Sequence, residues 1–223
     1  LMNFPILSSL IILPTVGALF LLFSKDKNSN TSKYVALFTS FVNFLISIYL
    51  WYLFDPYISN FQFVEERKWL ENFVNYKVGI DGISILFIIL TTLITPLCII
   101  SVNNTVKNRL RDFLIAILVM ESLMIGVFCS LDLVVFYLFF EAGLIPMFLI
   151  IGIWGGERRV YSAFKFFLYT LLGSVLMLVA IISIYWIAGT TDIVQLYELG
   201  IDKKYQNLLW LGFFSSFAVK TPM

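Results

Sequence analysis

The sequence lacks histidine altogether and has only two cysteines, Cys98 and Cys129, each within an apolar stretch. Histidine is the usual haem ligand and the commonest ligand for zinc and copper. The two cysteines form neither a CxxC motif nor an iron–sulfur ligand set. Glycine-rich phosphate-binding motifs of the GxGxxG or GxxxxGK type are also missing. We therefore expect the chain to bind no redox centre and no nucleotide of its own.

Charge is scarce as well. Only 13% of the 223 residues are charged, whereas 60% are hydrophobic and 17% aromatic. A soluble domain has about 25% charged residues, so this chain has too few to cover a surface that faces water. The net charge of +1 provides no basic field for nucleic acid. A soluble enzyme, a nucleic-acid binder and a disordered tail are excluded, and an integral membrane protein remains.

The apolar residues form long runs. A helix needs about 20 apolar residues to cross the hydrocarbon core of a bilayer. The predicted fold class is therefore all-α, a polytopic transmembrane helix bundle of about seven spans with a broken helix near the C-terminus. We expect residues 1–223 to form a single transmembrane domain. The seven predicted spans are Phe4–Phe23, Tyr34–Phe54, Ile83–Val102, Phe113–Cys129, Leu133–Trp154, Ala163–Ala188 and Leu208–Met223.

The loops between these spans indicate an orientation. With the N-terminus outside, the inner loops contain more Lys and Arg than the outer loops, as the positive-inside rule requires. The first span has no basic leader and no evident cleavage site, so we interpret it as a retained anchor. The largest loop, Asp55–Gly82, is predicted to be extramembrane and outside, and to contain a short hairpin or an interfacial flap. The cations of the inner loops are Lys25, Lys27, Lys33, Lys107, Arg109, Arg111, Arg158, Arg159 and Lys165.

Three charged residues fall inside predicted spans: Glu121, Glu141 and Lys220. A charge near the bilayer centre costs about 2.5–3.5 kcal/mol, so such residues usually face the bundle interior and mark a pathway. Glu121 and Glu141 are equally far from the turn near Leu131, which places both roughly 15 Å from it on adjacent antiparallel helices. Two acids at one depth are suited to a proton relay. The alternative is that each acid is structural, bonded to a neighbouring Ser or Tyr hydroxyl.

Proline accompanies two of these charges. Pro146 follows Glu141 and removes the hydrogen bond to the Ala142 carbonyl, so we expect a kink beside the acid. Pro222 acts in the same way beside Lys220. A broken helix next to an intramembrane charge is typical of transporters, where unwound backbone lines an ion site.

Lys165 lies about one turn into the sixth predicted span. Its side chain either extends to the inner interface or receives protons between the first site and the next. Asp81, Asp132 and Asp192 lie at outer span ends and are predicted to be caps or turn residues.

Several motifs resemble a known family. The stretches LFFEAGLIPMF around Glu141 and SFAVKTP around Lys220 are similar to chain 4 of the proton-pumping NADH:quinone oxidoreductase, respiratory complex I, one of its antiporter-like subunits. The stretches VGIDGIS, KFFLYTLLGS and GTTD match as well, in the same order. The likeness covers nearly the whole chain and is closer to the mitochondrial form.

The resemblance implies that the chain sits in the membrane arm and moves protons. It implies that Glu141 and Lys220 are the paired charges of a half-channel, and that Glu121 and Lys165 also take part. It further implies that NADH, FMN, the iron–sulfur clusters and ubiquinone are bound by partner subunits, and that other membrane-arm subunits and lipid surround the chain. The expected location is the mitochondrial inner membrane rather than a bacterial plasma membrane.

The chain differs from the family in length, because it stops at Met223 where the family continues. Three explanations are open: an incomplete sequence, a subunit divided between two genes, or a remnant that no longer pumps. We favour a divided subunit, completed by a separate polypeptide that carries the remaining helices. Two other functions stay as alternatives, a subunit of a cation/proton antiporter and a structural membrane scaffold.

Overall fold

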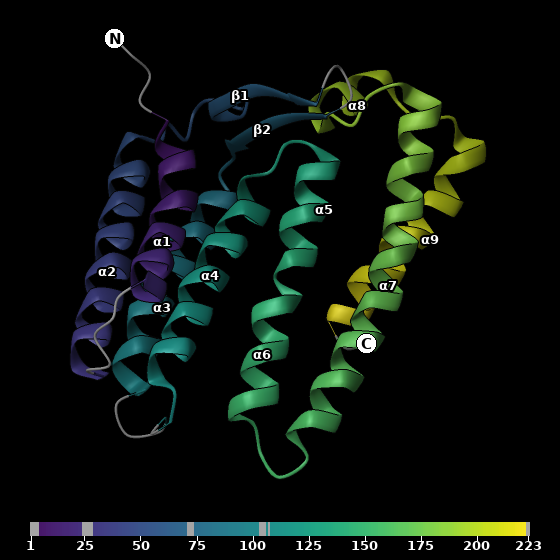
Figure 1. Cartoon of the computed structure of the whole chain (residues 1–223). Helices are drawn as coiled ribbons and strands as arrows, with labels where there is room; N and C mark the ends of the chain where they lie inside the picture. Colours follow the sequence, from purple (N-terminus) through teal and green to yellow (C-terminus); the bar gives the residue numbers. More distant parts are fainter. Residues whose placement is uncertain (1–4, 24–28, 71–73, 103–105, 107, 222–223) are drawn as a thin grey trace. The chain divides into compact units, whose positions relative to one another are not determined.

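The computed structural model describes residues 5–23, 29–70, 74–102, 106 and 108–221 (Figure 1). Contacts divide the chain into two compact units. The first comprises Leu1–Glu65 and Val78–Cys129, and the second comprises Glu66–Lys77 and Ser130–Met223. The predicted single domain stays a prediction.

The described part of the first unit contains four helices: α1 (Ile6–Phe23), α2 (Ser29–Leu53), α3 (Ser84–Ser101) and α4 (Leu110–Cys129). Helix α4 packs against the other three. Small residues allow a close approach of α1 and α2, since a Cβ atom added at Gly17 would lie 2.6 Å from Thr39 Cγ2. One buried apolar cluster of this unit consists of Ala18, Leu21, Ala36, Ile99, Leu114 and Leu118.

The second unit is built around one long helix. It contains α5 (Leu133–Ala142), α6 (Leu144–Trp154), α7 (Arg159–Ala188), α8 (Ile193–Leu199) and α9 (Lys203–Lys220). Helix α7 packs against α5, α6 and α9, most extensively against α9. A buried apolar cluster between α7 and α9 consists of Ala180, Ile184 and Leu209.

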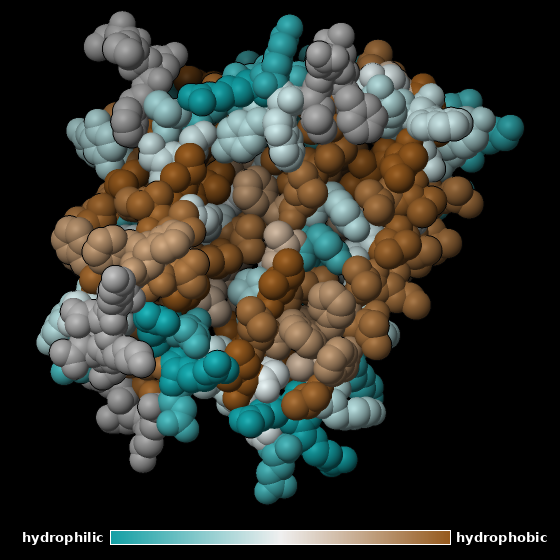
Figure 2. Space-filling model, in the orientation of Figure 1, coloured by the Kyte–Doolittle hydropathy of each residue, from teal (hydrophilic) through white to brown (hydrophobic). Residues whose placement is uncertain are grey.

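Most of these helices are apolar all round, as expected of helices that face lipid. Figure 2 shows the apolar side chains gathered along the middle of the helices and the hydrophilic ones at their ends. Within the described residues, six helices are long and apolar enough to cross a membrane, with α5 and α6 together forming one span. The seventh predicted span, Leu208–Met223, begins within α9 and ends outside the described residues. Polar residues occupy the first turns of α9, so the described part of this helix is not apolar over a length that qualifies.

The loop between α2 and α3 forms a hairpin, which confirms one of the two predictions for it. Strand β1 (Gln62–Leu70) pairs with β2 (Val74–Ile80) in a two-stranded sheet. Lys77 of β2 belongs to the second unit and is bonded to other residues of that unit. The Leu131 amide donates to the Lys77 carbonyl at 2.9 Å, and the Lys77 ammonium forms an ion pair with Asp192.

Asp132 and Asp192 are the N-caps of α5 and α8, as predicted. Asp132 Oδ1 accepts hydrogen bonds from the amides of Val134 and Val135, and Asp192 does the same at the start of α8. The Thr191 hydroxyl donates to Asp132 Oδ2 at 2.6 Å, and Asp132 and Asp192 form an antiparallel bridge. These contacts tie the first turns of α5 and α8 together.

Asp81 lies in the turn before α3, and its carboxylate accepts a hydrogen bond from the Ser84 amide at 2.7 Å. Burial alone would raise the pKa of Asp81, but the hydrogen bonds from Ser84 and Ile83 outweigh it, so the pKa lies below its ordinary value of 3.8.

We expect Asp192→Asn to destabilise the chain through Lys77. Asparagine is as good an N-cap as aspartate, so the start of α8 is preserved. The Lys77 ammonium, however, is left without its counter-ion although its side chain is only 14% exposed. The free energy of unfolding should fall by about 3 kcal/mol, measured as a lower midpoint of thermal unfolding in detergent.

The matched control is Asp202→Asn. Asp202 caps α9 through the Lys204 amide and is exposed. Its substitution should change the midpoint little. Equal shifts for both variants would contradict a special role of the Lys77–Asp192 pair.

Candidate functional site

The fifth predicted span is interrupted next to its acid. Helix α5 ends at Ala142 and α6 begins at Leu144, with Gly143 between them. Pro146 has no amide hydrogen to donate to the Ala142 carbonyl, so the helix cannot continue unbroken through this turn. Glu141 is the last residue but one of α5. The predicted interruption beside Glu141 is therefore confirmed.

Lys220, the last residue of α9, reaches this interruption. Its Nζ donates to the carbonyl oxygen of Phe140 at 2.9 Å and lies 3.1 Å from the centroid of the Phe140 ring. The ring is held by two others, Phe136 at 5.5 Å and Phe217 at 6.0 Å between centroids. A carbonyl dipole and an aromatic face thus replace water around the ammonium group. Pro222, predicted to break the helix beside Lys220, lies outside the described residues.

Glu141 and Lys220 are electrostatic neighbours, as the interaction between their charges shows. They do not form a salt bridge of 4.0 Å or less in the described part of the chain, where the ammonium is bonded to Phe140 instead. The Glu141 Oε2 atom is buried and has no hydrogen-bond partner among the described residues. An acid with a spare acceptor beside an amine that is bonded elsewhere can accept a proton without first breaking a salt bridge.

Two hydroxyl-bearing residues that sequence reasoning missed belong to the same region. Ser216, one turn before Lys220 on α9, is buried, and its Oγ has no partner within the described residues. Tyr137, one turn before Glu141 on α5, interacts with Glu141 and with Ser174 of α7. The sequence signal that could have identified them is their spacing. Ser216 precedes Lys220 by four residues and Tyr137 precedes Glu141 by four, which places each pair on one face of its helix.

Close packing of α7 and α9 positions Lys220. A Cβ atom added at Gly173 would lie 3.0 Å from Val219 Cγ2, and one added at Gly212 would lie 2.9 Å from the Ala180 Cβ. Small residues at helix interfaces allow backbones to approach closely in membranes. The position of the ammonium therefore depends on two glycines, one on each helix.

Glu121 belongs to the first unit. Its side chain is 1% exposed and accepts a hydrogen bond from Asn43 Nδ2 of α2 at 2.9 Å. The partner is thus an amide, not the Ser or Tyr hydroxyl considered for a structural acid, and Asn43 was missed. Because Glu121 and Glu141 lie in different units, their predicted common depth stays a prediction.

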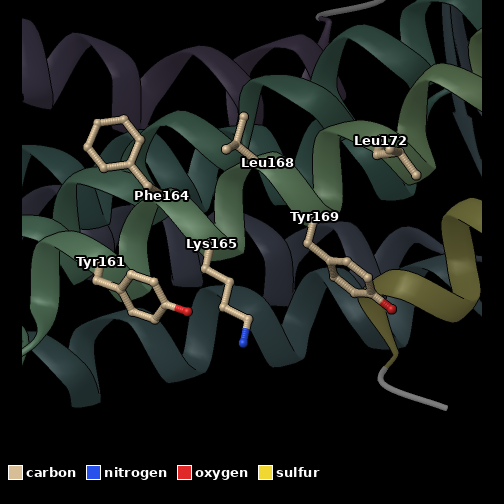
Figure 3. Close-up of a pocket in the computed structure, with 6 residues that line it drawn as sticks. All are labelled: Tyr161, Phe164, Lys165, Leu168, Tyr169 and Leu172. Atoms are coloured by element: carbon tan, nitrogen blue, oxygen red, sulfur yellow. The ribbon is translucent and has the colours of Figure 1, made fainter.

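Lys165 lies on an exposed face of α7. Figure 3 shows its side chain between Tyr161 and Tyr169, among apolar residues of the same helix. The Lys165 Nζ is 5.9 Å from the centroid of the Tyr161 ring. An exposed cation beside a tyrosine is what the interfacial alternative predicts, and its part in proton transfer stays a prediction.

Two family models match the chain. The model described as "NADH-ubiquinone oxidoreductase chain 4, amino terminus" matches residues 9–127, which is more than half of the chain. The chain belongs to this family. A second model, "NADH:quinone oxidoreductase/Mrp antiporter, TM", matches residues 130–223. The boundary between the two matches coincides with the boundary between the compact units at Cys129 and Ser130.

Named chain 4 relatives extend over nearly all of this chain. NADH-quinone oxidoreductase subunit M of Rhodobacter capsulatus is 55% identical over 211 residues, which cover 89% of this chain and 40% of the relative. NADH-ubiquinone oxidoreductase chain 4 of Marchantia polymorpha is 46% identical over 219 residues, which cover 97% of this chain and 44% of the relative. The chain therefore spans less than half the length of these relatives.

A solved structure supports the fold of this chain 4 homologue. A chain of respiratory complex I from Thermus thermophilus with bound NADH superimposes with a TM-score of 0.83 at 30% sequence identity. The superposition covers 97% of this chain and 44% of that chain. In this chain 4 homologue, Glu121 falls in the amino-terminal match, whereas Glu141, Lys165 and Lys220 fall in the other.

We expect Gly173→Val to displace α9. The added side chain would overlap Val219, and overpacking of this kind costs about 1–3 kcal/mol. The separation of α7 and α9 should increase, measured as the distance between spin labels at the exposed positions Leu172 and Leu208 in a Cys98→Ser background.

Gly156→Ala serves as the control, because nothing lies within 4 Å of a Cβ atom at that glycine. It should leave the label separation as in the unsubstituted protein. An unchanged separation in Gly173→Val as well would show that this glycine does not set the position of α9.

Proposed function

We propose that this chain is a proton-translocating membrane-arm subunit of a respiratory NADH:quinone oxidoreductase. Membership of the chain 4 family and the names of the relatives support the assignment. The single observation that carries it is the arrangement at the interrupted helix, where Lys220 is bonded to the Phe140 carbonyl next to the unpartnered carboxyl oxygen of Glu141.

The proposed mechanism uses the alternative partners of Lys220. While the ammonium is bound to the Phe140 carbonyl, Glu141 is unpaired and can take up a proton. When Lys220 moves toward Glu141, the positive charge favours the ionised carboxylate and the proton leaves. The interruption between α5 and α6 and the glycine packing of α9 allow a small movement to change the partner. Oxidation of NADH and reduction of quinone occur in other subunits, where NADH, FMN, iron–sulfur clusters and ubiquinone are bound.

Two further residues take supporting parts in this proposal. Glu121 holds a proton in the first unit, and Lys165 receives protons near the inner surface. Lys165 is exposed in this chain, so the second role requires a neighbouring surface of the complex to cover it.

The proposed partners are the other membrane-arm subunits and lipid, and the proposed location is the mitochondrial inner membrane. The chain 4 relatives of Marchantia polymorpha and Arabidopsis thaliana support this location, whereas the Rhodobacter capsulatus relative supports a bacterial membrane. Cell fractionation distinguishes the two. The remaining length of the relatives resides either in the same polypeptide or in a separate one, and the intact mass of the subunit in the purified complex decides between them.

A second function has one specific observation in its favour. The family model over residues 130–223 covers Mrp antiporters as well as NADH:quinone oxidoreductases. A subunit of a cation/proton antiporter would migrate apart from NADH dehydrogenase activity in native electrophoresis. Co-migration with that activity supports the first proposal.

Glu141→Gln should abolish most proton translocation. Glutamine fits the same space but cannot exchange a proton, and a positioned acid or base contributes on the order of 100-fold or more to a transfer rate. The measurement is proton uptake per NADH oxidised in membrane vesicles.

Glu157→Gln is the matched control, because Glu157 is an exposed acid of the same unit. It should pump normally. Full coupling in Glu141→Gln would show that the role assigned to Glu141 is wrong.

Lys220→Ala should impair pumping while the complex still assembles. The substitution removes the ammonium from the Phe140 carbonyl and from the neighbourhood of Glu141. Lys204→Ala, on the exposed first turn of the same helix, should have no effect. The proton stoichiometry of both variants is compared in vesicles with equal subunit content. An unchanged value for Lys220→Ala would argue against this residue.

A further inference from the structure

Asn43 and Glu121 form one hydrogen bond, and each side chain has an oxygen atom left without a hydrogen-bond partner among the described residues. Asn43 Nδ2 donates to Glu121 Oε1 at 2.9 Å. The other oxygen of each group, Asn43 Oδ1 and Glu121 Oε2, is buried and has no hydrogen-bond partner among the described residues. Asn43 is 0% exposed and Glu121 is 1% exposed. Buried acceptors without a donor are costly, so two in one contact require an explanation.

An ionised carboxylate would also need a counter-ion here, and the surrounding helices supply none in the described part of the chain. Burial and the Asn43 hydrogen bond act on Glu121, whereas no charged neighbour does. Helices α1 and α3 contain no Lys, Arg, Asp or Glu. The titratable residues on the helices packed against Glu121 and on its own helix are Lys33, Tyr34, Tyr49 and Tyr52 on α2, Cys98 on α3, and Arg111, Asp112 and Cys129 on α4.

These groups lie too far along the helices to neutralise Glu121. Lys33 is ten residues from Asn43, and Arg111 is ten residues from Glu121, each roughly 15 Å at the helical rise. A buried charge without a partner takes the neutral form instead. The surroundings therefore favour a carboxylic acid at this position.

We propose that Glu121 carries a proton on Oε2 and that this O–H donates to Asn43 Oδ1, so that Asn43 is the positioning residue of a protonated acid. One proton converts the spare acceptor of the acid into a donor, and the spare acceptor of the amide receives it. Acid and amide then exchange two hydrogen bonds in a closed ring, and neither oxygen remains unsatisfied. The inference rests on the proposed function, to which it adds a fixed proton-holding site in the first unit.

An asparagine is needed for this ring because its side chain has a donor and an acceptor side by side. The neighbouring serines of α2 have no separate donor and acceptor atoms, and their hydroxyl hydrogens are already used within the helix. The hydroxyls of Ser40 and Ser47 donate to carbonyls of their own helix, at 3.1 Å to Leu37 and 2.7 Å to Phe44. Ser47 also bonds to Thr92 of α3 at 2.7 Å.

The test is infrared spectroscopy of the assembled complex near pH 7. An ordinary glutamate, with a pKa of about 4.3, is ionised there and has no carboxylic acid band. We expect a carboxylic acid band in the native complex that disappears in Glu121→Gln. This variant should assemble, since glutamine can form the same ring with Asn43. We expect the band to shift to higher wavenumber in Asn43→Leu, where the acid carbonyl loses its donor.

Ser47→Ala is the matched control, because it removes an equally buried hydrogen bond one turn along the same helix. It should leave the band in place, which separates the specific role of Asn43 from a general loosening of the bundle. If Asn43→Leu does not assemble, Asn43→Ser replaces it, since serine cannot complete the ring and should also shift the band.

Two results would overturn the inference. One is that the native complex has no carboxylic acid band that depends on Glu121. The other is that the effect is not specific to Asn43, because the Asn43 variant leaves the band in place or Ser47→Ala shifts the band equally. Proton pumping of the Glu141→Gln variant is a separate readout. Full pumping there would refute the role that the proposed function assigns to Glu141 and leave the protonation state of Glu121 as the infrared result gives it.

Discussion

An ammonium group within a membrane-spanning bundle must find partners that replace water, and Lys220 finds them in the backbone. A continuous α-helix uses its carbonyl groups internally, so the interruption at Gly143 is what makes the Phe140 region available to a side chain from another helix. The aromatic cluster of Phe136, Phe140 and Phe217 completes the surroundings. The site thus depends on a local defect in one helix and close packing of another.

Glu121, which is buried, and Glu141, which is half-buried, have different neighbours. Glu141 lies beside a cation that is bonded to another group, so its charge state can respond to a small movement of that cation. Glu121 lies beside a neutral amide, with no described charge close to it. The first environment suits exchange and the second suits retention. In the proposed function, the nearest neighbours of the two glutamates therefore suit them to different tasks.

The sequence predicted the elements of this arrangement better than their contacts. Pro146 correctly indicated the interruption next to Glu141, because the loss of an amide hydrogen acts locally. The partner of Lys220 could not be predicted, since any of several carbonyls near a break would satisfy an ammonium group. Asn43 was overlooked, although Ser40, Asn43 and Ser47 form a polar stripe at helical spacing in an apolar helix. The seventh predicted span, Leu208–Met223, begins after the polar residues of the first turns of α9 and ends outside the described residues, so it stays a prediction.

The hairpin of β1 and β2 has a consequence for how the protein is made. The segment Glu66–Lys77 belongs to the second compact unit, although it precedes α3 and α4 of the first unit in the chain. Lys77 meets Asp192 across 115 residues of sequence. At translation rates of about 5–20 residues per second, the ribosome needs about 6–23 s to supply that aspartate. Throughout this interval the Lys77 ammonium is without its counter-ion, so this ion pair forms only after helices α3 to α7 have been synthesised.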